Sequence, residues 1–397
     1  MNLAVLFSRL GPYHVARLDA VGMRSYLTAL ELSGRATEYA WDPVDTPSTF
    51  ERITLFPEES HRAVSRSILR ERIAAALDRT APDAVVIPGW DDPGALAALQ
   101  WCRQHNVPRV VMSASSAYDA PRSWWREHIK KQVVKTYDAG IVGGTRHKNY
   151  LESLGIPAEN TFTGYNVVDN SHFRQGAKEA KDRGSSLRGE IGLPDRYFLA
   201  IGRFVPKKNF VFLLEAYASY RKAVEDPWDL VLLGDGPLER EIRDCRSTLG
   251  IEQSVKLPGF KQYEALPAYY GLAEAFIHTS VREQWGLVVN EAMAAGLPVA
   301  VSDRCGCVPD LVNEPRNGFT FAPDDKKTLV QHLITLSHDG INLRSMGQAS
   351  QKIIDDWTPD TFARQLLRAA EAARAAYPQD KKTWFPRSAL IKALMYR

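Results

Sequence analysis

Residues 274–303 read EAFIHTSVREQWGLVVNEAMAAGLPVAVSD. The run AFIH is short and apolar, a polar segment follows it, LVVNEAMAA has helical spacing, and LPVAV is again short and apolar. Short β-type runs that alternate with helical segments are typical of βα units around a parallel sheet. This stretch therefore predicts a strand, a loop, a helix and a second strand. It places Glu283 on the loop and Glu291 on the helix.

The same alternation extends over both halves of the chain. In the first half the expected strands lie at 3–7, 83–89, 109–113 and 139–144, and the expected helices at 17–32, 94–106 and 145–155. In the second half the expected strands lie at 197–203, 229–236, 254–259, 274–280 and 297–303, and the expected helices at 209–221, 237–249 and 290–295. The length of 397 residues suits two domains. We expect an α/β protein with two Rossmann-like βαβ domains facing each other across a cleft.

A polar segment divides the two halves. Residues 174–189, RQGAKEAKDRGSSLRG, are charged and rich in Gly and Ser, which is the composition of a linker. This predicts an N-terminal domain over 1–173 and a C-terminal domain over 190–374. After Pro359 the pattern FARQLLRAAEAARAAY is again helical.

Composition excludes several classes of protein. The 50 basic and 47 acidic residues give a formal net charge of +3, too even a balance for a nucleic-acid footprint. Cys102, Cys245, Cys305 and Cys307 are too scattered for a disulfide framework, and no further Cys or His cluster turns the last two into a metal site. The chain begins without a basic leader and contains no apolar run of about 20 residues, so we expect a cytoplasmic protein that does not span a membrane.

The loop IGRFVPKKN, residues 201–209, leaves the end of an expected buried strand and enters a helix. Ligands bind at that end of strands in open α/β sheets. Arg203 offers a fork for phosphate oxygens and Lys208 a compact point charge, so the pair suits a diphosphate, with Lys207 as the adjacent alternative. An exposed basic loop without a ligand fits the same residues.

Glycine turns follow several expected strands. Gly234 and Gly236 in LLGDGP, Gly286 after Gln284 and Trp285, and Gly11 in SRLGPYH all lie where a strand gives way to a helix. Backbone N–H groups at such helix starts favour phosphate. Each turn by itself is weak evidence, since glycine is also used simply to make turns.

Glu283 and Glu291 bracket QWGLVVN. A loop carboxylate accepts hydrogen bonds from sugar hydroxyls, and a helix carboxylate can hold ribose hydroxyls. The spacing is common by chance, and it becomes informative through the strands around it and the Arg203 and Lys208 loop upstream.

The stretch 276–312 resembles the signature of the retaining GT-B glycosyltransferases of family 4, E-x7-E followed by EAMAxGxPV and a Gly-rich turn. IGRFVPKKN is similar to that family's diphosphate-binding loop, and LLGDGPLERE and LPGF match its flanking segments. The similarity is dense between 197 and 323 and thin before 174.

The resemblance implies a retaining, metal-independent transfer from a UDP- or GDP-sugar to a hydroxyl of a glycan, lipid-linked or small-molecule acceptor. The donor would lie in the C-terminal domain and the acceptor in the N-terminal one, with no cofactor besides the nucleotide sugar. A final helix at about 375–397 would cross back to the N-terminal domain. The implied donor contacts are Arg203 and Lys208 with the diphosphate, Glu283 with the sugar, Glu291 with the ribose, Phe260 beside the base, and backbone amides near Gly286 and Leu287 with the phosphates. We assign Glu283 a sugar-binding and electrostatic role and name no covalent nucleophile.

The chain departs from the family pattern in two places. The Gly-rich turn reads RCGCVPD over 304–310, with Asp310 where the family has Glu. Many members carry a His near the end of an N-terminal strand that touches the donor sugar, whereas VVMSASS has Ser113 and Ser115 there.

Further candidates lie on the acceptor side. His14 follows the Gly11 turn and would touch sugar or acceptor, or be a surface histidine. Trp90, Asp91 and Asp92 follow the strand at 83–89. The two aspartates form either a divalent-metal pair or, as we favour, a helix N-cap ahead of Pro93 or an acceptor contact.

Two segments combine aromatic and basic residues. Residues 124–135 contain Trp124, Trp125, Arg126, Lys130, Lys131 and Lys135, and the tail 381–397 reads KKTWFPRSALIKALMYR. Both suit contact with an anionic or lipid-linked acceptor or with the inner face of a membrane. A solvated helix face and a core-packed terminal helix are the alternatives.

Three rival functions share the fold class. A sugar-nucleotide epimerase or hydrolase would need an acid/base pair that we do not find. A nicotinamide oxidoreductase would show G-x-G-x-x-G after a strand, and the chain has none. A catalytically inactive binding partner would not need Arg203, Lys208, Glu283 and Glu291 together.

Overall fold

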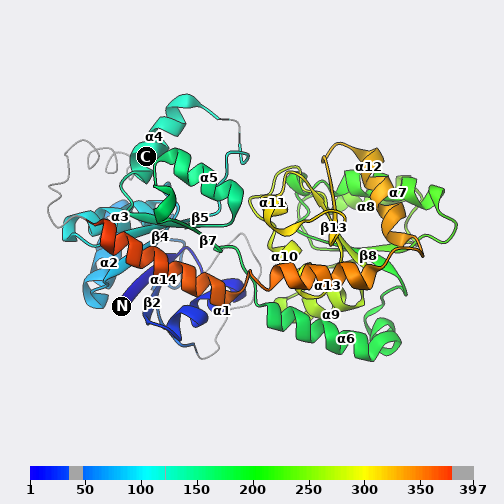
Figure 1. Cartoon of the computed structure of the whole chain (residues 1–397), viewed down its shortest axis with the longest axis horizontal. Helices are drawn as coiled ribbons and strands as arrows, with labels where there is room; N and C mark the ends of the chain where they lie inside the picture. Colours follow the sequence, from blue (N-terminus) through cyan, green and yellow to red (C-terminus); the bar gives the residue numbers. More distant parts are fainter. Residues whose placement is uncertain (35–47, 121, 378–397) are drawn as a thin grey trace. The chain divides into compact units, whose positions relative to one another are not determined.

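The computed structural model describes residues 1–34, 48–120 and 122–377. The chain forms two compact units, each with its own parallel sheet (Figure 1). Unit 1 contains Met1–Val167 and returns at Thr358, and unit 2 is the continuous segment Val168–Trp357. The α/β class with two Rossmann-like domains is therefore confirmed.

The sheet of unit 1 has the strand order β3-β2-β1-β4-β5-β6-β7, with parallel neighbours throughout. Its strands are β1 (Asn2–Phe7), β2 (Tyr26–Ser33), β3 (Glu51–Phe56), β4 (Ala84–Pro88), β5 (Arg109–Ser113), β6 (Ala139–Val142) and β7 (Thr161–Thr163). The central strands are buried apolar runs, as expected for a sheet covered on both faces.

Helices flank this sheet. They are α1 (Pro12–Gly22), α2 (Arg66–Thr80), α3 (Pro93–His105), α4 (Trp124–Val134), α5 (Thr145–Leu154), the short η1 (Ala158–Asn160) and α14 (Pro359–Ala376). Within unit 1, α14 packs along α1 and over β6 and β7. Its buried Phe362, Leu366 and Ala370 lie four residues apart and form one apolar stripe.

The sheet of unit 2 has the order β10-β9-β8-β11-β12-β13 and is also parallel. Its strands are β8 (Tyr197–Ile201), β9 (Asp229–Leu233), β10 (Val255–Gly259), β11 (Ala275–His278), β12 (Val299–Ser302) and β13 (Gly318–Phe321). Its helices are α6 (Asn170–Ile191), η2 (Pro206–Lys208), α7 (Phe210–Ala223), α8 (Glu239–Thr248), η3 (Tyr263–Ala265), α9 (Leu266–Leu272), α10 (Leu287–Ala294), α11 (Val308–Leu311), α12 (Lys326–Ser337) and α13 (Leu343–Ile354).

Each sheet reverses its strand order once, between β1 and β4 in unit 1 and between β8 and β11 in unit 2. The loops that leave the two strands at such a switch point diverge to opposite faces of the sheet and open a crevice between them. Ligands of open α/β sheets bind there, outside the carboxyl ends of the strands. The loop that carries Arg203 and Lys208 follows β8, and the loop that carries Glu283 follows β11.

Three expected boundaries are wrong. The helix expected at 17–32 ends at Gly22, and Tyr26–Ser33 is strand β2. Its polar residues Thr28 and Glu31 are buried in the sheet, so the apolar spacing that resembled a helix continues along a strand buried on both faces.

The expected linker at 174–189 lies inside α6 instead. Phe173, Ala177 and Ala180 are buried on one face of that helix, which packs against α9. The Gly/Ser signal does correspond to a local break, since Gly184 has φ 48° and ψ −120° within the helical run. The crossing back to unit 1 occurs at Thr358 rather than near 375, and most of the helix expected at 375–397 lies outside the described residues.

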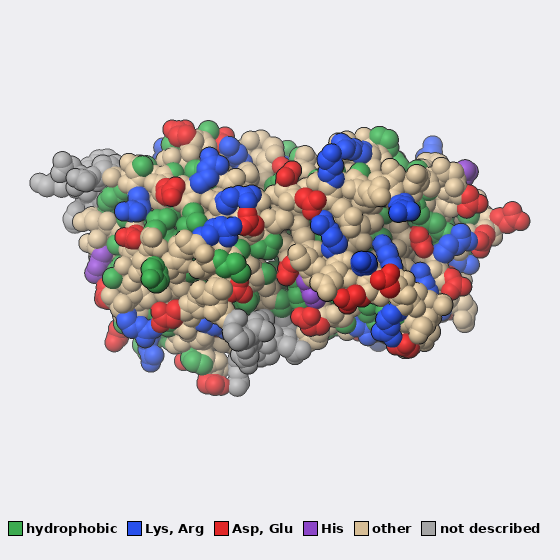
Figure 2. Space-filling model, turned by 60° about the horizontal axis from the view of Figure 1, so that its bottom comes forward, with side chains coloured by type: hydrophobic (Ala, Val, Ile, Leu, Met, Phe, Trp, Pro, Cys, Tyr) green, Lys and Arg blue, Asp and Glu red, His purple; other side chains and the backbone are tan. Residues whose placement is uncertain are grey.

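Surface charge is mixed. Figure 2 shows Lys and Arg side chains interspersed with Asp and Glu on the face in view, in keeping with the near balance of the whole sequence. Among the described residues, no helix is both long enough and apolar enough to cross a lipid bilayer.

Candidate donor site

The loop after β8 is held by backbone contacts to the loop after β11. It forms the short helix η2, and Asn209 then takes a left-handed conformation with φ 60° before α7 begins. The Thr279 hydroxyl donates to the Lys208 carbonyl at 2.9 Å, and the Val281 amide donates to the Lys207 carbonyl at 2.9 Å. The two loops at the switch point of unit 2 are thereby fixed to each other.

Lys208 and Glu283 meet between these loops. The Lys208 ammonium forms an ion pair with Glu283 Oε2, and each side chain is 13% exposed. The Ser280 hydroxyl donates to the same oxygen at 3.3 Å, and His278 Nε2 lies 3.6 Å from it. The structure thus brings together two residues that the sequence predicted for one site, and it adds His278 and Ser280.

The charge state of this cluster follows from its surroundings. Burial by itself would raise the pKa of Glu283, but the contact with His278 and the positive charge of Lys208 outweigh burial and hold that pKa below its ordinary value. Burial lowers the pKa of His278, and Lys208 acts in the same direction. At neutral pH the cluster therefore contains an ionised carboxylate, a cation and a neutral imidazole.

The Glu283 loop is supported from β12. Glu283 forms a parallel bridge with Cys305, the Gly306 amide donates to the Glu283 carbonyl at 3.0 Å, and the Cys307 amide donates to the Trp285 carbonyl at 3.3 Å. The turn RCGC, which departs from the family pattern, thus packs as backbone support for Glu283. Both cysteines are buried thiols.

Gly286 begins α10 with φ 101°, a conformation that favours glycine. A Cβ atom there would lie 3.5 Å from Glu283 Cγ and 3.6 Å from His278 Nε2, so the turn closes directly over the cluster. Leu287 is the first residue of α10 and is partly buried. The N–H groups of this first turn lie next to Glu283, which is consistent with phosphate binding at a helix start.

Gly234 and Gly236 have a steric role beside Arg203. A Cβ on Gly234 would lie 1.9 Å from the Gly202 carbonyl oxygen, and one on Gly236 would lie 2.7 Å from the Phe204 carbonyl oxygen. The Phe204 amide donates to the Asp235 carbonyl at 2.6 Å. The β9 loop therefore supports the backbone of the β8 loop. The Arg203 side chain is exposed, and it makes no ion pair with the residues that the structure describes.

Glu291 lies deeper than its expected role suggests. Its side chain on α10 is fully buried, and the Tyr270 hydroxyl donates to its Oε2 at 2.7 Å. Tyr270 itself packs edge-on against Phe173 of α6. This tyrosine, which lies on α9 and has no local signal, was not predicted from the sequence. Phe260 follows β10 at the edge of the sheet and is partly buried.

In unit 1, His14 caps the helix that follows Gly11. Gly11 is the N-cap of α1, and its amide donates to His14 Nδ1 at 3.1 Å. This is one half of a capping box, because glycine has no side chain to make the reciprocal bond. Burial, followed by the charge of Arg17, lowers the pKa of His14 well below its ordinary value. His14 is therefore a neutral acceptor at its Nδ1 atom.

Of the two aspartates after β4, Asp92 forms the expected helix N-cap. Asp92 caps α3 by accepting the Gly94 amide at 2.8 Å, and it also pairs with His61 at 3.1 Å. Asp91 is exposed, and Trp90 is buried with a ring centroid 6.4 Å from that of Tyr150. Among the described residues there is no group of three or more His, Cys, Asp or Glu side chains that could hold a metal ion.

The serines after β5 form a turn. The Ser115 amide donates to the Ser113 hydroxyl at 3.1 Å, and Ser116 is buried with its hydroxyl donating to Asp119 at 2.8 Å. Ser115 is partly exposed at the carboxyl end of the sheet of unit 1. Ser115 thus lies at the edge of the sheet where ligands bind in open α/β sheets, one strand away from the switch point between β1 and β4.

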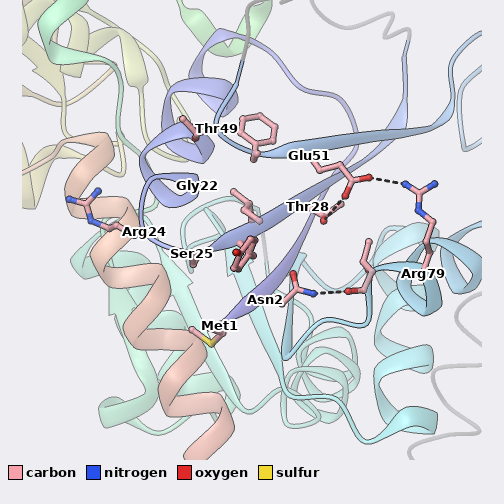
Figure 3. Close-up of a pocket in the computed structure, with 13 residues that line it drawn as sticks. Met1, Asn2, Gly22, Arg24, Ser25, Thr28, Thr49, Glu51 and Arg79 are labelled. Carbon is pink, nitrogen blue, oxygen red and sulfur yellow. Dashed lines mark hydrogen bonds and ion pairs between the residues drawn. The ribbon is translucent and has the colours of Figure 1, made fainter.

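A hollow of about 850 Å³ lies elsewhere in unit 1 (Figure 3). It is lined by the starts of β1, β2 and β3, including Asn2, Tyr26 and Glu51, and by Arg79 of α2, which pairs with Glu51 at 2.9 Å. These are the amino ends of the strands, opposite the edge at which ligands bind in such sheets. The candidate donor site is therefore the switch point of unit 2 and not this hollow.

Comparisons with known proteins agree with this geometry. Residues 187–353 match the family of glycosyl transferases group 1. Sulfoquinovosyl transferase SQD2 of Arabidopsis thaliana is 27% identical over 325 residues, covering 77% of this chain, and the chain spans 60% of the length of that relative. Sucrose-phosphate synthase of Thermosynechococcus elongatus superposes with a TM-score of 0.72 at 18% identity, covering 92% of this chain and 97% of the other. HepE of Anabaena, in complex with UDP, superposes with a TM-score of 0.69 at 18% identity, covering 92% and 98%.

The chain thus has the GT-B fold. The likeness to the two solved structures is a likeness of fold, at identities too low to transfer a substrate. The segment that matches the glycosyl transferases of group 1 lies within unit 2, and it contains Arg203, Lys208, Glu283 and Glu291.

Proposed function

We propose that this protein is a retaining, metal-independent glycosyltransferase that moves a sugar from a UDP- or GDP-sugar to a hydroxyl of a glycan, lipid-linked or small-molecule acceptor. The observation that carries the proposal is the buried pair of Lys208 and Glu283 at the switch point of unit 2. A cation and a carboxylate at that point match the two charges of the reaction, a diphosphate that leaves and a sugar that becomes positive.

The leaving diphosphate gains negative charge as the glycosidic bond breaks, and groups already in place stabilise that charge most effectively. Lys208 is positioned by its backbone contact with Thr279 and by Glu283. Arg203, exposed on the same loop, offers a bidentate fork for phosphate oxygens. The first-turn amides at Gly286 and Leu287 add donors at a helix start. No divalent ion is required in this arrangement.

Glu283 stays ionised, because its pKa is held below the ordinary value. An ionised carboxylate accepts hydrogen bonds from the sugar hydroxyls and favours positive charge on the reacting sugar carbon. We give it this electrostatic role, without a covalent bond to the sugar. In the proposed site the Glu291 carboxylate holds the ribose, and the Tyr270 hydroxyl orients that carboxylate.

UDP is the first nucleotide to test, because HepE, which has the same fold, is described in complex with UDP. We place the acceptor at the switch point of unit 1, at the carboxyl ends of β1 and β4. Gly11, His14, Trp90 and Asp91 lie on the loops and the helix start there, and Ser115 lies on the loop after the neighbouring β5.

Thermal unfolding with UDP, GDP and ADP, and then with their sugars, tests the donor part of the proposal. A nucleotide that binds only the folded state raises the unfolding temperature, and the stabilisation grows with the logarithm of its concentration once this exceeds the dissociation constant. Screening acceptors with the best donor and determining the anomeric configuration of the product by NMR tests the rest. Absence of stabilisation by every nucleotide would overturn the donor site, and an inverted product would overturn retention. Release of free sugar at an equal rate without acceptor would assign hydrolysis instead.

A further inference from the structure

Helix α4 of unit 1 presents two tryptophans to solvent. Trp124 is 83% exposed and Trp125 is 40% exposed. Tryptophan is highly buried on average, because its ring offers a large apolar area. Before Val133 the helix has no fully buried residue. An outward-facing pair of this kind therefore needs an explanation other than the core.

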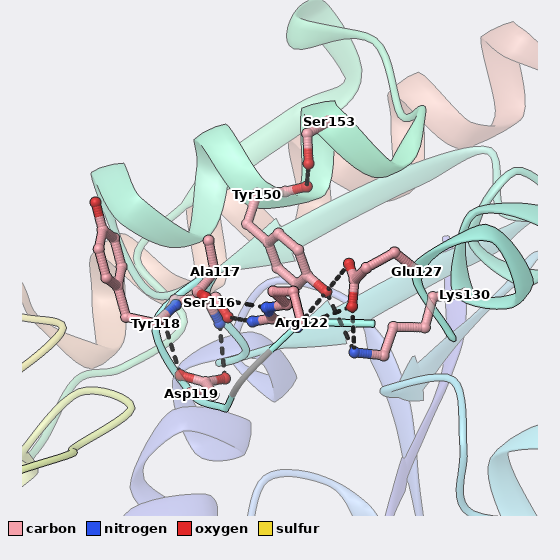
Figure 4. A network of polar contacts seen from close by, with 9 residues as sticks. All are labelled: Ser116, Ala117, Tyr118, Asp119, Arg122, Glu127, Lys130, Tyr150 and Ser153. Atoms are coloured by element: carbon pink, nitrogen blue, oxygen red, sulfur yellow. Dashed lines mark hydrogen bonds and ion pairs between the residues drawn. The ribbon is translucent and has the colours of Figure 1, made fainter. Parts of the chain in front are cut away.

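Two polar side chains of α4, Glu127 and Lys130, face α5 instead. Glu127 accepts Tyr150 of α5 at 2.7 Å, Lys130 at 2.9 Å and Arg122 at 3.1 Å. Figure 4 shows Tyr150 directed from α5 towards these three side chains. The contacts with Lys130, Tyr150 and Arg122 together lower the pKa of Glu127 despite its partial burial, so it remains charged.

An ordinary surface helix turns its apolar stripe inward and its charges outward. The C-terminal end of α4 does so, since Val133 and Val134 are buried in the core of unit 1. Its N-terminal turns differ, because the polar network joins them to α5 while the tryptophan rings stay outside.

Cations accompany the exposed rings. The Arg126 guanidinium lies 5.1 Å from the Trp125 ring centroid, and Arg146 of α5 lies 5.1 Å from the ring of Tyr118, which is 60% exposed. Between 122 and 135 the chain has one carboxylate, Glu127, and that one is used within the network. The cations of this segment are Arg122, Arg126, Lys130, Lys131 and Lys135.

We propose that this surface of α4, formed by Trp124, Trp125, Arg126 and Lys131, docks unit 1 on an anionic lipid membrane. Tryptophan and tyrosine rings are preferred at the membrane–water interface, where one part of the ring is apolar and the other is wet. Basic side chains close to an anionic leaflet add attraction that falls off within a Debye length. Exposed rings beside Arg126 and Lys131, which form no ion pair with the residues that the structure describes, complement this partner, whereas an acidic protein would not require two protruding indoles.

The surface goes beyond the proposed function, and its test measures binding rather than turnover. The purified chain is sedimented with vesicles of phosphatidylcholine alone and with vesicles that also contain phosphatidylglycerol. Three variants accompany it: Trp124→Ala with Trp125→Ala, Arg126→Glu with Lys131→Glu, and Tyr26→Ala as the matched control. Tyr26 is 83% exposed, like Trp124, but lies on β2.

We expect the wild-type chain and Tyr26→Ala to sediment with the anionic vesicles and not with neutral ones. The tryptophan variant should bind at least about tenfold more weakly, because its ring contacts are lost. The charge-reversal variant should lose about fivefold for each basic side chain, and raising salt from about 0.05 M to about 0.5 M should release the wild type.

Three results would overturn the proposal. One is anionic-vesicle binding by the tryptophan variant equal to that of the wild type, and another is no binding by the wild type at low salt. The third is a wild-type dimer in analytical ultracentrifugation that the tryptophan variant loses while vesicle binding is absent, which would assign the surface to a second copy of the chain. All of these residues are exposed, so circular dichroism should show the variants folded.

Discussion

Lys208 and Glu283 stand 75 residues apart in the sequence, and the fold joins them in an ion pair that is mostly shielded from water. Shielding strengthens the interaction of each group with any third charge brought beside it. A diphosphate that approaches Lys208 therefore meets a cation whose position is already set, next to a carboxylate that stays ionised. Several measurements follow from this relationship and its neighbours.

Replacing Lys208 with Met should lower kcat/KM for the nucleotide sugar by about 10²-fold or more, the usual effect of removing one stabilising group at a developing charge. The unfolding temperature should fall only modestly, because Ser280 and His278 still contact Glu283. Lys207→Met is the matched control, since Lys207 is the exposed neighbour on the same loop, and its rate should stay within about twofold of the wild type. Equal rates for both variants would remove Lys208 from the mechanism.

Glu291→Gln should weaken UDP binding by about tenfold or more, because a hydrogen bond to a charged group contributes about 1.5–3 kcal/mol. Tyr270→Phe, which removes the bond at 2.7 Å without removing the carboxylate, should weaken binding less. Isothermal titration calorimetry measures both. If Glu291→Gln bound UDP as the wild type does, the carboxylate would have a structural role in α10 only.

His14 makes stability depend on pH. Its pKa is lowered in the folded state by burial and by Arg17, so only the unfolded chain takes up a proton as the pH falls below the ordinary value of 6.5. The contribution of neutral His14 to the free energy of unfolding is therefore complete above pH 6.5, and it is lost as the pH falls below that value. His14→Gln keeps a side chain that can cap α1 but cannot titrate. Between about pH 7.5 and about pH 5.5 its free energy of unfolding should decrease less than that of the wild type, as denaturant titrations would show. Parallel losses would refute the assignment.

Gly236→Ala should destabilise unit 2 strongly. Its φ of 146° disfavours any side chain, and a Cβ would lie 2.8 Å from the Phe204 amide nitrogen. Gly250→Ala separates the two effects, because Gly250 has φ 65° with no atom within 4 Å of the added Cβ. We expect about 1 kcal/mol of destabilisation for Gly250→Ala and about 3 kcal/mol or more for Gly236→Ala. Similar unfolding temperatures for the two variants would show that the β8 loop relaxes without cost.

Transfer should survive a chelator such as EDTA. Lys208 and Arg203 supply positive charge at the proposed diphosphate position, and Asp92 is occupied by the start of α3 and by His61. The rate is measured before and after chelation, with manganese added back. A loss that manganese restores would contradict the metal-independent mechanism and direct attention back to Asp91.

Sequence patterns located most elements of unit 2 because its buried parallel strands read as continuous apolar runs, as in Tyr197–Ile201. They failed at Tyr26–Ser33, where Glu31 interrupts a buried strand. That carboxylate accepts the Leu10 amide at 2.8 Å and the Thr54 hydroxyl at 2.7 Å. Partners from two separate segments, the loop after β1 and strand β3, satisfy the charge, and no local pattern contains that information.

Residues of the candidate site could be predicted from the sequence where the loops that carry them could be located. Lys208 and Glu283 could be named because each follows an apolar run and precedes a helix. Tyr270 could not, because its bond to Glu291 depends on how α9 packs beside α10. His278 carried a weak signal, a titratable side chain at the last position of an otherwise apolar strand. The family resemblance indicated the roles of Lys208 and Glu283, and the structure showed which side chains contact them.

Helix α14 bears on how the chain is made. Unit 2 is one uninterrupted segment, whereas unit 1 is complete only when Pro359–Ala376 packs on α1 and β6. During translation the ribosome releases this helix after all of unit 2. Until α14 has been synthesised, the apolar surface of unit 1 that this helix covers stays exposed. Unit 2 does not need α14 and can fold before it is made. A chain that ends at Trp357 would contain all of unit 2 but would lack the last helix of unit 1.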